Sequence, residues 1–243
     1  MGLTVEISDV CKRFGSVDAL KNVTLTLGPG TVHCVIGDNG AGKSTLLKVL
    51  SGVCQPDCGE IRIAGKTVEL TSAKVARRVG IETVHQDLGL VDSMNIARNF
   101  FLGAEPTWGL GLLRMRKMRN DTAAALADVG LSRTLDPSLT VDALSGGERQ
   151  AISIGRAVHF QRVGLVLDEP TAALSVGETR KVFEYVEKAK ALGLVVVIVL
   201  HNMVQATQVA DYVHVMRHGR IVATHKPAEC SVELLEGEVI GSG

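Results

Sequence analysis

Five short aliphatic runs, each bounded by turn-forming residues, are the feature of this chain that most restricts its fold. They lie at 31–36, 80–84, 163–167, 195–200 and 212–216. Continuous apolar runs of this length are typical of strands that are covered on both faces. Longer helix-forming stretches lie between them, at 43–51, 145–160 and 176–191. This alternation predicts an α/β fold with a mostly parallel sheet covered by helices.

Two regions depart from this pattern. Apolar residues alternate with polar ones near the start of the chain, which indicates antiparallel strands with one wet face; these are Val5, Ile7, Val10, Val23, Leu25, Leu27, Ile61 and Ile63. The stretch 87–139 lacks strong strand runs and holds helix formers such as 122–129, so it is expected to be a helical insertion. We predict one domain in which 1–86 and 161–243 form the core with the antiparallel part, and 87–160 form a helical subdomain.

Composition excludes several classes of protein. The 26 acidic and 26 basic side chains cancel, so a nucleic-acid-coating protein is not indicated. The mean hydropathy is +0.22, but the longest apolar stretch, 191–200, is about half of the ~20 residues that a spanning helix needs. No secretory signal is visible, and a cytosolic location is expected. Of the five cysteines only Cys54 and Cys58 are close in sequence, which is weak support for zinc and favours reduced thiols.

A glycine-rich loop follows the first aliphatic run. Its residues, Gly37-Asp38-Asn39-Gly40-Ala41-Gly42-Lys43-Ser44-Thr45, satisfy the pattern G-x-x-x-x-G-K-[ST]. Between a strand and a helix, such a loop points several backbone N–H groups at one phosphate. Lys43 would reach the β- and γ-phosphates, and the Ser44 hydroxyl would be a magnesium ligand. A chance match is the alternative, and the strand, the helix and the Lys-Ser pair together argue against it.

Two adjacent carboxylates, Asp168 and Glu169, end the run 163–167. They would be costly if buried unpaired, so they are expected to face a cation or water at the carboxyl edge of the sheet. We assign Asp168 to the magnesium shell and Glu169 to orienting and deprotonating the attacking water. The alternative is a strand-to-loop boundary with two solvated acids.

The segment Ser145-Gly146-Gly147 opens a predicted helix and is followed by Glu148. An N-capping serine explains Ser145 but not two consecutive glycines, which weaken a helix start. The glycines make sense if another group must approach the backbone closely, at a helix end that favours anions.

With these motifs in order, nearly the whole chain resembles the ATP-binding subunit of an ABC transporter. Residues 37–45 resemble its Walker A motif, 144–150 its signature and 165–169 its Walker B motif. The resemblance implies the α/β fold with an antiparallel β subdomain and a helical insertion. It also implies ATP and Mg²⁺ as cofactors, with hydrolysis of the ATP.

Three further residues take a role from the resemblance alone. Gln86 matches the Q-loop glutamine, a catalytic residue that also binds magnesium. His201 matches the switch histidine, and Phe14 stands where the family stacks an aromatic ring on adenine. Each keeps an ordinary alternative: a solvated loop amide, a satisfied strand-end histidine and a core aromatic residue.

The chain departs from the usual family motifs at two positions, with Glu148 in place of Gln and Ser175 in place of Asp. In these variants it resembles the monosaccharide importers of the ribose, xylose and fructose type. This branch implies a head-to-tail pair of ATPase subunits, in which the signature of one completes the ATP site of the other. It also implies a membrane permease, indirectly a periplasmic-type sugar-binding protein, and a place on the cytoplasmic side of the cell membrane. No nucleic-acid partner is expected.

Other functions leave signals against which the chain can be compared. A nucleic-acid ATPase of this superfamily would show a coiled-coil arm, fused ATPase domains or a basic face, and a GTPase would show Asn-Lys-x-Asp. None of these signals is visible in the sequence. A regulatory domain that binds ATP without hydrolysis is disfavoured by Glu169, Gln86 and His201, although Ser175 and Glu148 keep it open. The apolar loop 88–96 suits a groove for a permease helix, or else packs locally within the insertion.

Overall fold

The computed structural model describes residues 3–85, 88–128, 130, 135–160, 163–172 and 174–241, and the chain divides into two compact units. The core unit comprises Met1–Gln86, Gln161–Pro170 and Ala189–Gly243, and the helical unit comprises Asp87–Phe160 and Thr171–Lys188. The helical unit therefore includes Thr171–Lys188, which the predicted boundaries assign to the core. The boundaries of the functional subdomains stay a prediction.

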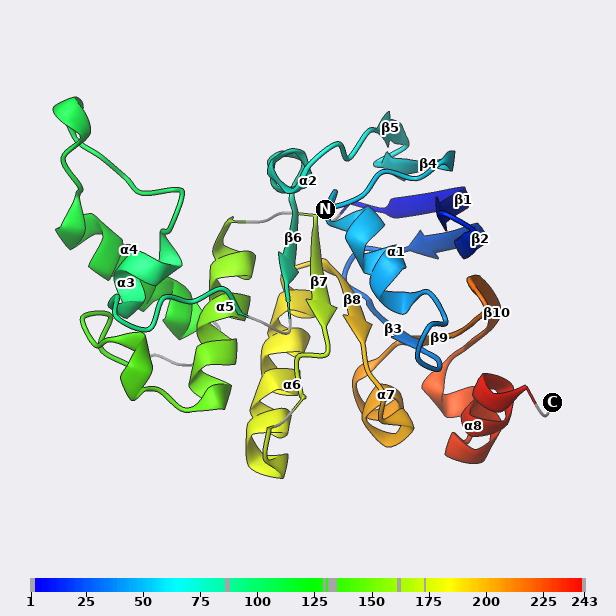
Figure 1. The fold of residues 1–243 in the computed structure, drawn as a ribbon. Helices are drawn as coiled ribbons and strands as arrows, with labels where there is room; N and C mark the ends of the chain where they lie inside the picture. Colours follow the sequence, from blue (N-terminus) through cyan, green and yellow to red (C-terminus); the bar gives the residue numbers. More distant parts are fainter. Residues whose placement is uncertain are drawn as a thin grey trace. The chain divides into compact units, whose positions relative to one another are not determined.

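A six-stranded sheet forms the centre of the core unit (Figure 1). Its strands, in spatial order, are β10 (Arg220–His225), β9 (Tyr212–Arg217), β3 (Val32–Ile36), β8 (Val195–Val199), β7 (Gly164–Asp168) and β6 (Ile81–Val84). All neighbours run parallel except β10 with β9. Every residue of β3 and β8 is buried, as continuous aliphatic runs require. The five predicted strands and the α/β fold are confirmed, whereas the edge strand β10 was not foreseen.

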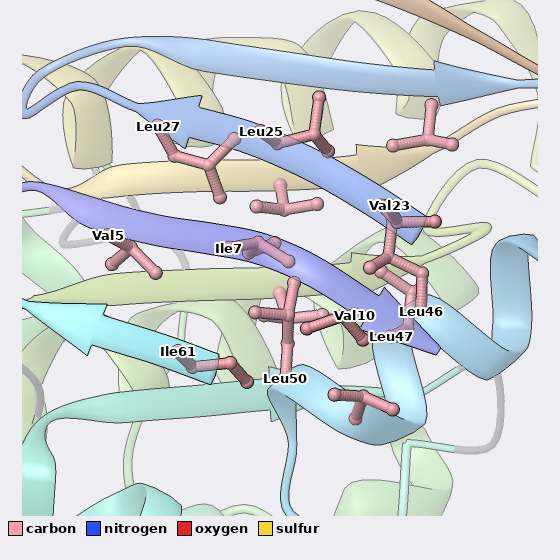
Figure 2. Close-up of a cluster of buried hydrophobic side chains, with 14 of the residues drawn as sticks. Val5, Ile7, Val10, Val23, Leu25, Leu27, Leu46, Leu47, Leu50 and Ile61 are labelled. Carbon is pink, nitrogen blue, oxygen red and sulfur yellow. The ribbon is translucent and has the colours of Figure 1, made fainter. Parts of the chain in front are cut away.

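The second sheet of the core unit is antiparallel, in the order β2 (Val17–Leu27), β1 (Val5–Phe14), β4 (Cys58–Ile63) and β5 (Lys66–Val68). Its alternating apolar residues point to one face, as Figure 2 shows for Val5, Ile7 and Leu25. Leu46, Leu47 and Leu50 of α1 (Lys43–Leu50) belong to the same buried cluster. The packing therefore holds α1 against this sheet, and the predicted antiparallel part is confirmed.

The remaining helices divide between the two units. Those of the core unit are α2 (Ala73–Val79), α7 (Met203–Val209) and α8 (Val232–Ile240), with the 3-10 turn Pro227–Glu229. Those of the helical unit are α3 (Ile96–Phe100), α4 (Met115–Asp128), α5 (Gly146–Phe160) and most of α6 (Val176–Ala191), with the 3-10 turns Gly109–Gly111 and Val141–Ala143. Helices α3, α4 and α5 pack on one another around fully buried side chains such as Phe100, Met118 and Ile152. Within the described ranges, no helix combines the length and apolar character needed to cross a bilayer.

Candidate functional site

The glycine-rich loop connects β3 to α1, and Gly42 caps the helix with a φ of 109°. Side chains rarely adopt this φ, and a Cβ on Gly42 would lie 2.6 Å from the carbonyl oxygen of Ala19. A Cβ on Gly37 would overlap the carbonyl oxygen of Met216. These two glycines therefore let the loop pack tightly on its neighbours. The motif alone did not show that glycine is needed at these positions for packing.

Lys43, the first residue of α1, is only 6% exposed. Its ammonium group donates to the carbonyl oxygens of Gly37 at 2.6 Å and Asp38 at 2.9 Å. Burial lowers the pKa of Lys43, and the carboxylates of Glu169, Asp38 and Asp168 act in the opposite direction. The loop thus holds a positive charge at the start of a helix, where anions are favoured.

Asp168 ends β7, and burial followed by the neighbouring charge of Glu169 raises its pKa. Glu169 has a φ of 49°, an uncommon value for a residue other than glycine. Its N–H donates to the carbonyl of Val199 at 3.2 Å, so the adjacent strand β8 helps to hold this conformation. Strained backbone of this kind is often found at functional sites.

The side chains of Glu169 and His201 meet at the carboxyl edge of the sheet. His201 Nε2 lies 2.6 Å from Glu169 Oε1. One residue follows β7 and the other follows β8, two parallel neighbours whose carboxyl ends share an edge. The fold therefore brings together two candidates that are far apart in the sequence.

A cavity of about 640 Å³ lies between the loop and this pair. Its lining residues are Ser16, Val17, Asp18, Ala19, Lys21, Asn39, Gly40, Ala41, Gly42, Lys43, Ser44, Thr45, Glu169, His201 and His218. The volume suits a small-molecule ligand or cofactor. The segment 16–21 and His218 were not predicted as site residues. His218 begins the turn between β9 and β10. The sequence did not predict β10, so it did not predict this turn.

Phe14 and Gln86 keep a role in the site that rests on the resemblance alone. Phe14 ends β1 with its side chain 49% exposed, and Lys12 Nζ lies 5.6 Å from the ring centroid. It is not part of the cavity lining described above, so a role in stacking stays a prediction. Gln86 lies outside the described residues.

The segment 145–148 builds a capped start for α5 in the helical unit. The N–H of Glu148 donates to Ser145 Oγ at 3.3 Å, and the N–H of Ser145 donates to Glu148 Oε2 at 2.9 Å. This reciprocal pair is a capping box, in which glutamate or glutamine serves equally well at the third position. The departure at Glu148 therefore has a local structural role.

Gly147 does allow a close approach, and the group that approaches is Glu178. The N–H of Gly147 donates to Glu178 Oε1 at 3.0 Å, and a Cβ on Gly147 would lie 2.9 Å from Glu178 Cγ. The other oxygen, Oε2, accepts from the N–H and hydroxyl of Ser175 at 3.0 and 2.8 Å. Hydrogen bonds from Ser175 and then Gly147 lower the pKa of Glu178. Ser175, the second residue that departs from the family motifs, therefore binds the same carboxylate as the start of α5.

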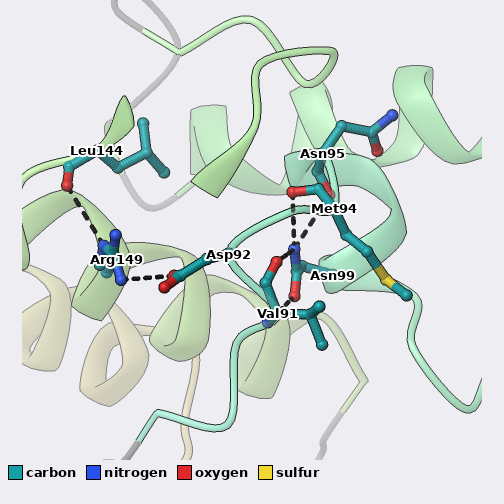
Figure 3. A network of polar contacts seen from close by, with 7 residues as sticks. All are labelled: Val91, Asp92, Met94, Asn95, Asn99, Leu144 and Arg149. Atoms are coloured by element: carbon teal, nitrogen blue, oxygen red, sulfur yellow. Dashed lines mark hydrogen bonds and ion pairs between the residues drawn. The ribbon is translucent and has the colours of Figure 1, made fainter. Parts of the chain in front are cut away.

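The loop 88–96 is fixed from within the helical unit (Figure 3). Asn99 is 1% exposed, and its amide donates to the carbonyls of Val91, Met94 and Asn95 at 3.0 to 3.3 Å. Its oxygen accepts from the N–H of Val91 at 2.7 Å, and Arg149 forms a 2.7 Å ion pair with Asp92. The half-buried side chains of Leu90 and Met94 are therefore carried on an ordered loop.

Comparison with known proteins identifies one matching family and several similar proteins. The family described as ABC transporter matches residues 20–172. The xylose/arabinose import ATP-binding protein XylG of Sulfolobus acidocaldarius is 43% identical over 94% of this chain and 90% of its own length. The fructose import ATP-binding protein FrcA of Rhizobium meliloti is 41% identical over 90% of this chain and 86% of its own.

Other relatives are longer. The putative ribose/galactose/methyl galactoside import ATP-binding protein 3 of Burkholderia ambifaria is 39% identical over 98% of this chain, which spans 46% of that protein. Among solved structures, an ATP-binding cassette of an ABC transporter has a TM-score of 0.85 at 25% identity, covering 99% of this chain and 98% of its own. A nucleotide-free cassette has a TM-score of 0.81 at 24% identity, covering 98% and 95%.

Proposed function

This chain belongs to the ABC transporter family, and on that premise we propose that it is the ATP-hydrolysing subunit that powers import of a sugar, a monosaccharide, through a separate membrane permease. One observation carries the proposal: a single cavity joins the glycine-rich loop to the paired side chains of Glu169 and His201. The printed names of the relatives, which are sugar import ATP-binding proteins, support the class of substrate.

The phosphates of ATP bind at the backbone N–H groups of 39–45, at the start of α1. Lys43 exchanges its two carbonyl contacts for the β- and γ-phosphates. The adenine ring stacks on Phe14, whose exposed face supports this assignment.

The donors near the loop fit a magnesium ion. The described residues contain no group of three or more His, Cys, Asp or Glu side chains that could hold a metal ion by themselves. Mg²⁺ on a nucleotide needs only one or two protein ligands, however, because phosphates and water supply the rest. Ser44 and Asp168 would hold it, with Gln86 by resemblance. Burial and the charge of Glu169 raise the pKa of Asp168, and a nearby cation would favour its ionised form. When bound, the ion neutralises charge on the β- and γ-phosphate oxygens.

Glu169 accepts the proton of the attacking water. A carboxylate is a weak base, so the value of this group in catalysis lies in its position. The positive φ of Glu169 and its contact with His201 set that position. His201 also reaches the γ-phosphate as a hydrogen-bond donor.

A second copy of the chain completes the site, head to tail. Ser145, Gly146 and Gly147, with Glu148, cap the γ-phosphate of the partner, because a helix start favours an anion. The N–H of Gly147 exchanges its bond to Glu178 Oε1 for a phosphate oxygen, and the closed site excludes water. The Ser145 hydroxyl accepts from Glu148 and keeps its own proton to donate. ATP holds the two subunits together, and hydrolysis releases them.

The permease binds at the loop 88–96, on the cytoplasmic side of the cell membrane, and a periplasmic-type sugar-binding protein acts through the permease. Transport of another substrate, or export, would use the same ATP site. A regulatory domain with weak hydrolysis is the remaining alternative, because Ser175 and Glu148 depart from the usual motifs.

The decisive experiment measures phosphate release from ATP by the purified chain, alone and with its permease in vesicles. We expect turnover that requires Mg²⁺, that Lys43→Ala abolishes, and that the transported sugar stimulates in the presence of its binding protein. A chain that binds ATP but releases no phosphate even with the permease would be a regulatory domain. Stimulation by another class of solute would overturn the sugar assignment.

A further inference from the structure

Two cysteines of the core unit, Cys11 on β1 and Cys58 on β4, lie directly opposite one another in the antiparallel sheet. Spacing along the chain had pointed to Cys54 and Cys58 as the nearest pair. Residues opposite one another on antiparallel strands have Cα atoms about 4.5–5.5 Å apart, within the range that a disulfide spans. The pairing of β1 with β4 therefore creates a thiol pair that the sequence does not reveal.

The contacts of the two thiols support this geometry. Cys11 Sγ and Cys58 Sγ lie 3.6 and 3.5 Å from the same atom, the carbonyl oxygen of Asp9. The sulfur atoms can be no further apart than the sum of these distances. The pKa of Cys58 is raised, first by a hydrogen bond with the Cys11 thiol and then by desolvation. The two thiols thus lie beside the same carbonyl group, close enough to influence one another.

The backbone is irregular at this corner of the sheet. The register between β1 and β4 shifts between Ser8 and Cys11, and Asp9 has a φ of 50°. Gly59 also has a positive φ, and a Cβ there would lie 2.4 Å from the carbonyl oxygen of Asp9. The bulge therefore turns one carbonyl toward both thiols.

Both thiols of the pair are accessible, although Cys54 and Cys230 are half-buried like Cys11. Cys58 is exposed and Cys11 is half-buried, so a small oxidant reaches both. Cys34 is fully buried in β3, and burial raises the pKa of its thiol. Cys230 contacts only the carbonyl of Pro227 at 4.0 Å among the partners recorded for the described residues.

We propose that Cys11 and Cys58 form a redox-active pair, which a peroxide oxidises to a disulfide between β1 and β4. The thiolate of one cysteine attacks a peroxide oxygen, the O–O bond breaks, and a sulfenic acid and hydroxide form; the hydroxide takes up the proton that the thiol had lost and becomes water. The second thiol loses its proton as it attacks the sulfenic sulfur, the S–S bond forms, and the hydroxide that leaves takes up that proton as water. Two thiols and one hydrogen peroxide yield one disulfide and two waters.

The corner is already held in place for this bond. Asp57, next to Cys58, accepts from Lys12 Nζ and from the N–H of Arg13, both at 2.7 Å. The disulfide therefore forms with little movement of either strand. Neither cysteine lines the nucleotide cavity, so the thiol measurements below do not depend on ATP turnover or on the proposed function.

The experiment treats the reduced full chain with a small excess of hydrogen peroxide at pH near ~8, where more of each thiol is ionised. Remaining thiols are counted with a maleimide, and peptides are mapped without reduction. We expect the count to fall from five to three, a mapped bond between Cys11 and Cys58, and full recovery with dithiothreitol.

Four variants sharpen the test. Cys11→Ser and Cys58→Ser should each prevent the intramolecular disulfide, whereas Cys54→Ser and Cys230→Ser should form it at the parent rate. A bond mapped from Cys58 to Cys54, or oxidation that yields sulfinic acid and no disulfide, would overturn the proposal. Mapping uses the parent chain, so the result stands even if a serine variant fails to fold.

Discussion

At the scale of single residues, the contact between His201 Nε2 and Glu169 Oε1 is the most informative detail. The ring orients the carboxylate, while the positive φ of Glu169 holds its backbone. The residue that we propose as the catalytic base thus also has an uncommon backbone conformation. Two predictions separate the roles of this pair.

Replacing Glu169 with Gln should leave ATP binding intact and lower turnover by about 10²–10⁴-fold, the usual cost of removing a general base. The amide has a similar shape but cannot accept the proton. Phosphate release and nucleotide affinity are the measurements, and the variant should also accumulate the ATP-bound dimer. Hydrolysis at the parent rate would show that another group is the base.

For His201→Ala we expect ATP binding to persist and turnover to fall by up to about 10²-fold, because Glu169 loses the ring that orients it. The variant His201→Gln can still donate one hydrogen bond to the carboxylate and should recover part of the rate. Steady-state kinetics of both variants provide the measurement. Full turnover in the alanine variant would remove histidine from the mechanism.

At the scale of elements, one carboxylate joins the starts of α5 and α6. Glu178 accepts from Gly147 at the first helix and from Ser175 at the second. Both residues lie at or next to departures from the usual family motifs. The departures are therefore compatible with an ordered signature segment in which local hydrogen bonds are satisfied.

Gly147→Ala should destabilise the chain by about 1–3 kcal/mol, because the new methyl group would overlap Glu178 and break its hydrogen bond with residue 147. Gly177→Ala is a matched control in the first turn of α6, where a Cβ would meet open space. The control should be neutral or slightly stabilising. Urea denaturation of the two variants tests the difference, and equal stabilities would argue against the contact with Glu178.

The loop 88–96 carries a prediction about the permease. Leu90→Asp or Met94→Asp should weaken association at least about tenfold, since each places an unpaired charge in an apolar contact. Leu112→Asp is the control, because Leu112 is a 67% exposed apolar residue elsewhere in the helical unit. Pull-down with the permease measures the effect, and unchanged association of all three variants would exclude this surface.

At the scale of the whole molecule, stability depends on a buried histidine pair in the central sheet. His33 Nδ1 lies 3.0 Å from His214 Nε2, and the two outer ring nitrogens contact Thr31 and Thr224 at 2.8 and 2.9 Å. Burial lowers the pKa of His33 to about 4 and that of His214 to about 3. Asp211 opposes the shift of His33, whereas His33 adds to that of His214.

These shifts predict the direction of the pH dependence. Between pH ~6.5 and ~4 the unfolded chain binds protons that the folded chain does not, so stability falls as the pH falls, by up to about 1.4 kcal/mol per pH unit for each histidine. Urea denaturation between pH ~7 and ~5 measures the slope. His214→Gln should flatten it, whereas His218→Gln, an exposed histidine, should not. A slope that His214→Gln leaves unchanged would place the dependence elsewhere.

The sequence by itself determined most elements of this protein and the phosphate-binding loop of its proposed site. Continuous aliphatic runs can only be buried on both faces, so they predicted the parallel strands, and the phosphate-loop pattern placed Lys43 at the start of α1. Alternating polar and apolar residues likewise predicted the antiparallel sheet.

Only the tertiary structure decided which distant residues touch. The pairing of β7 with β8 brought Glu169 to His201, and the bulged pairing of β1 with β4 brought Cys11 to Cys58. It also showed that Glu178 fills the space beside Gly147. Local patterns report the burial and conformation of each segment, whereas these contacts depend on strand order, register and packing, which link positions that no periodicity connects.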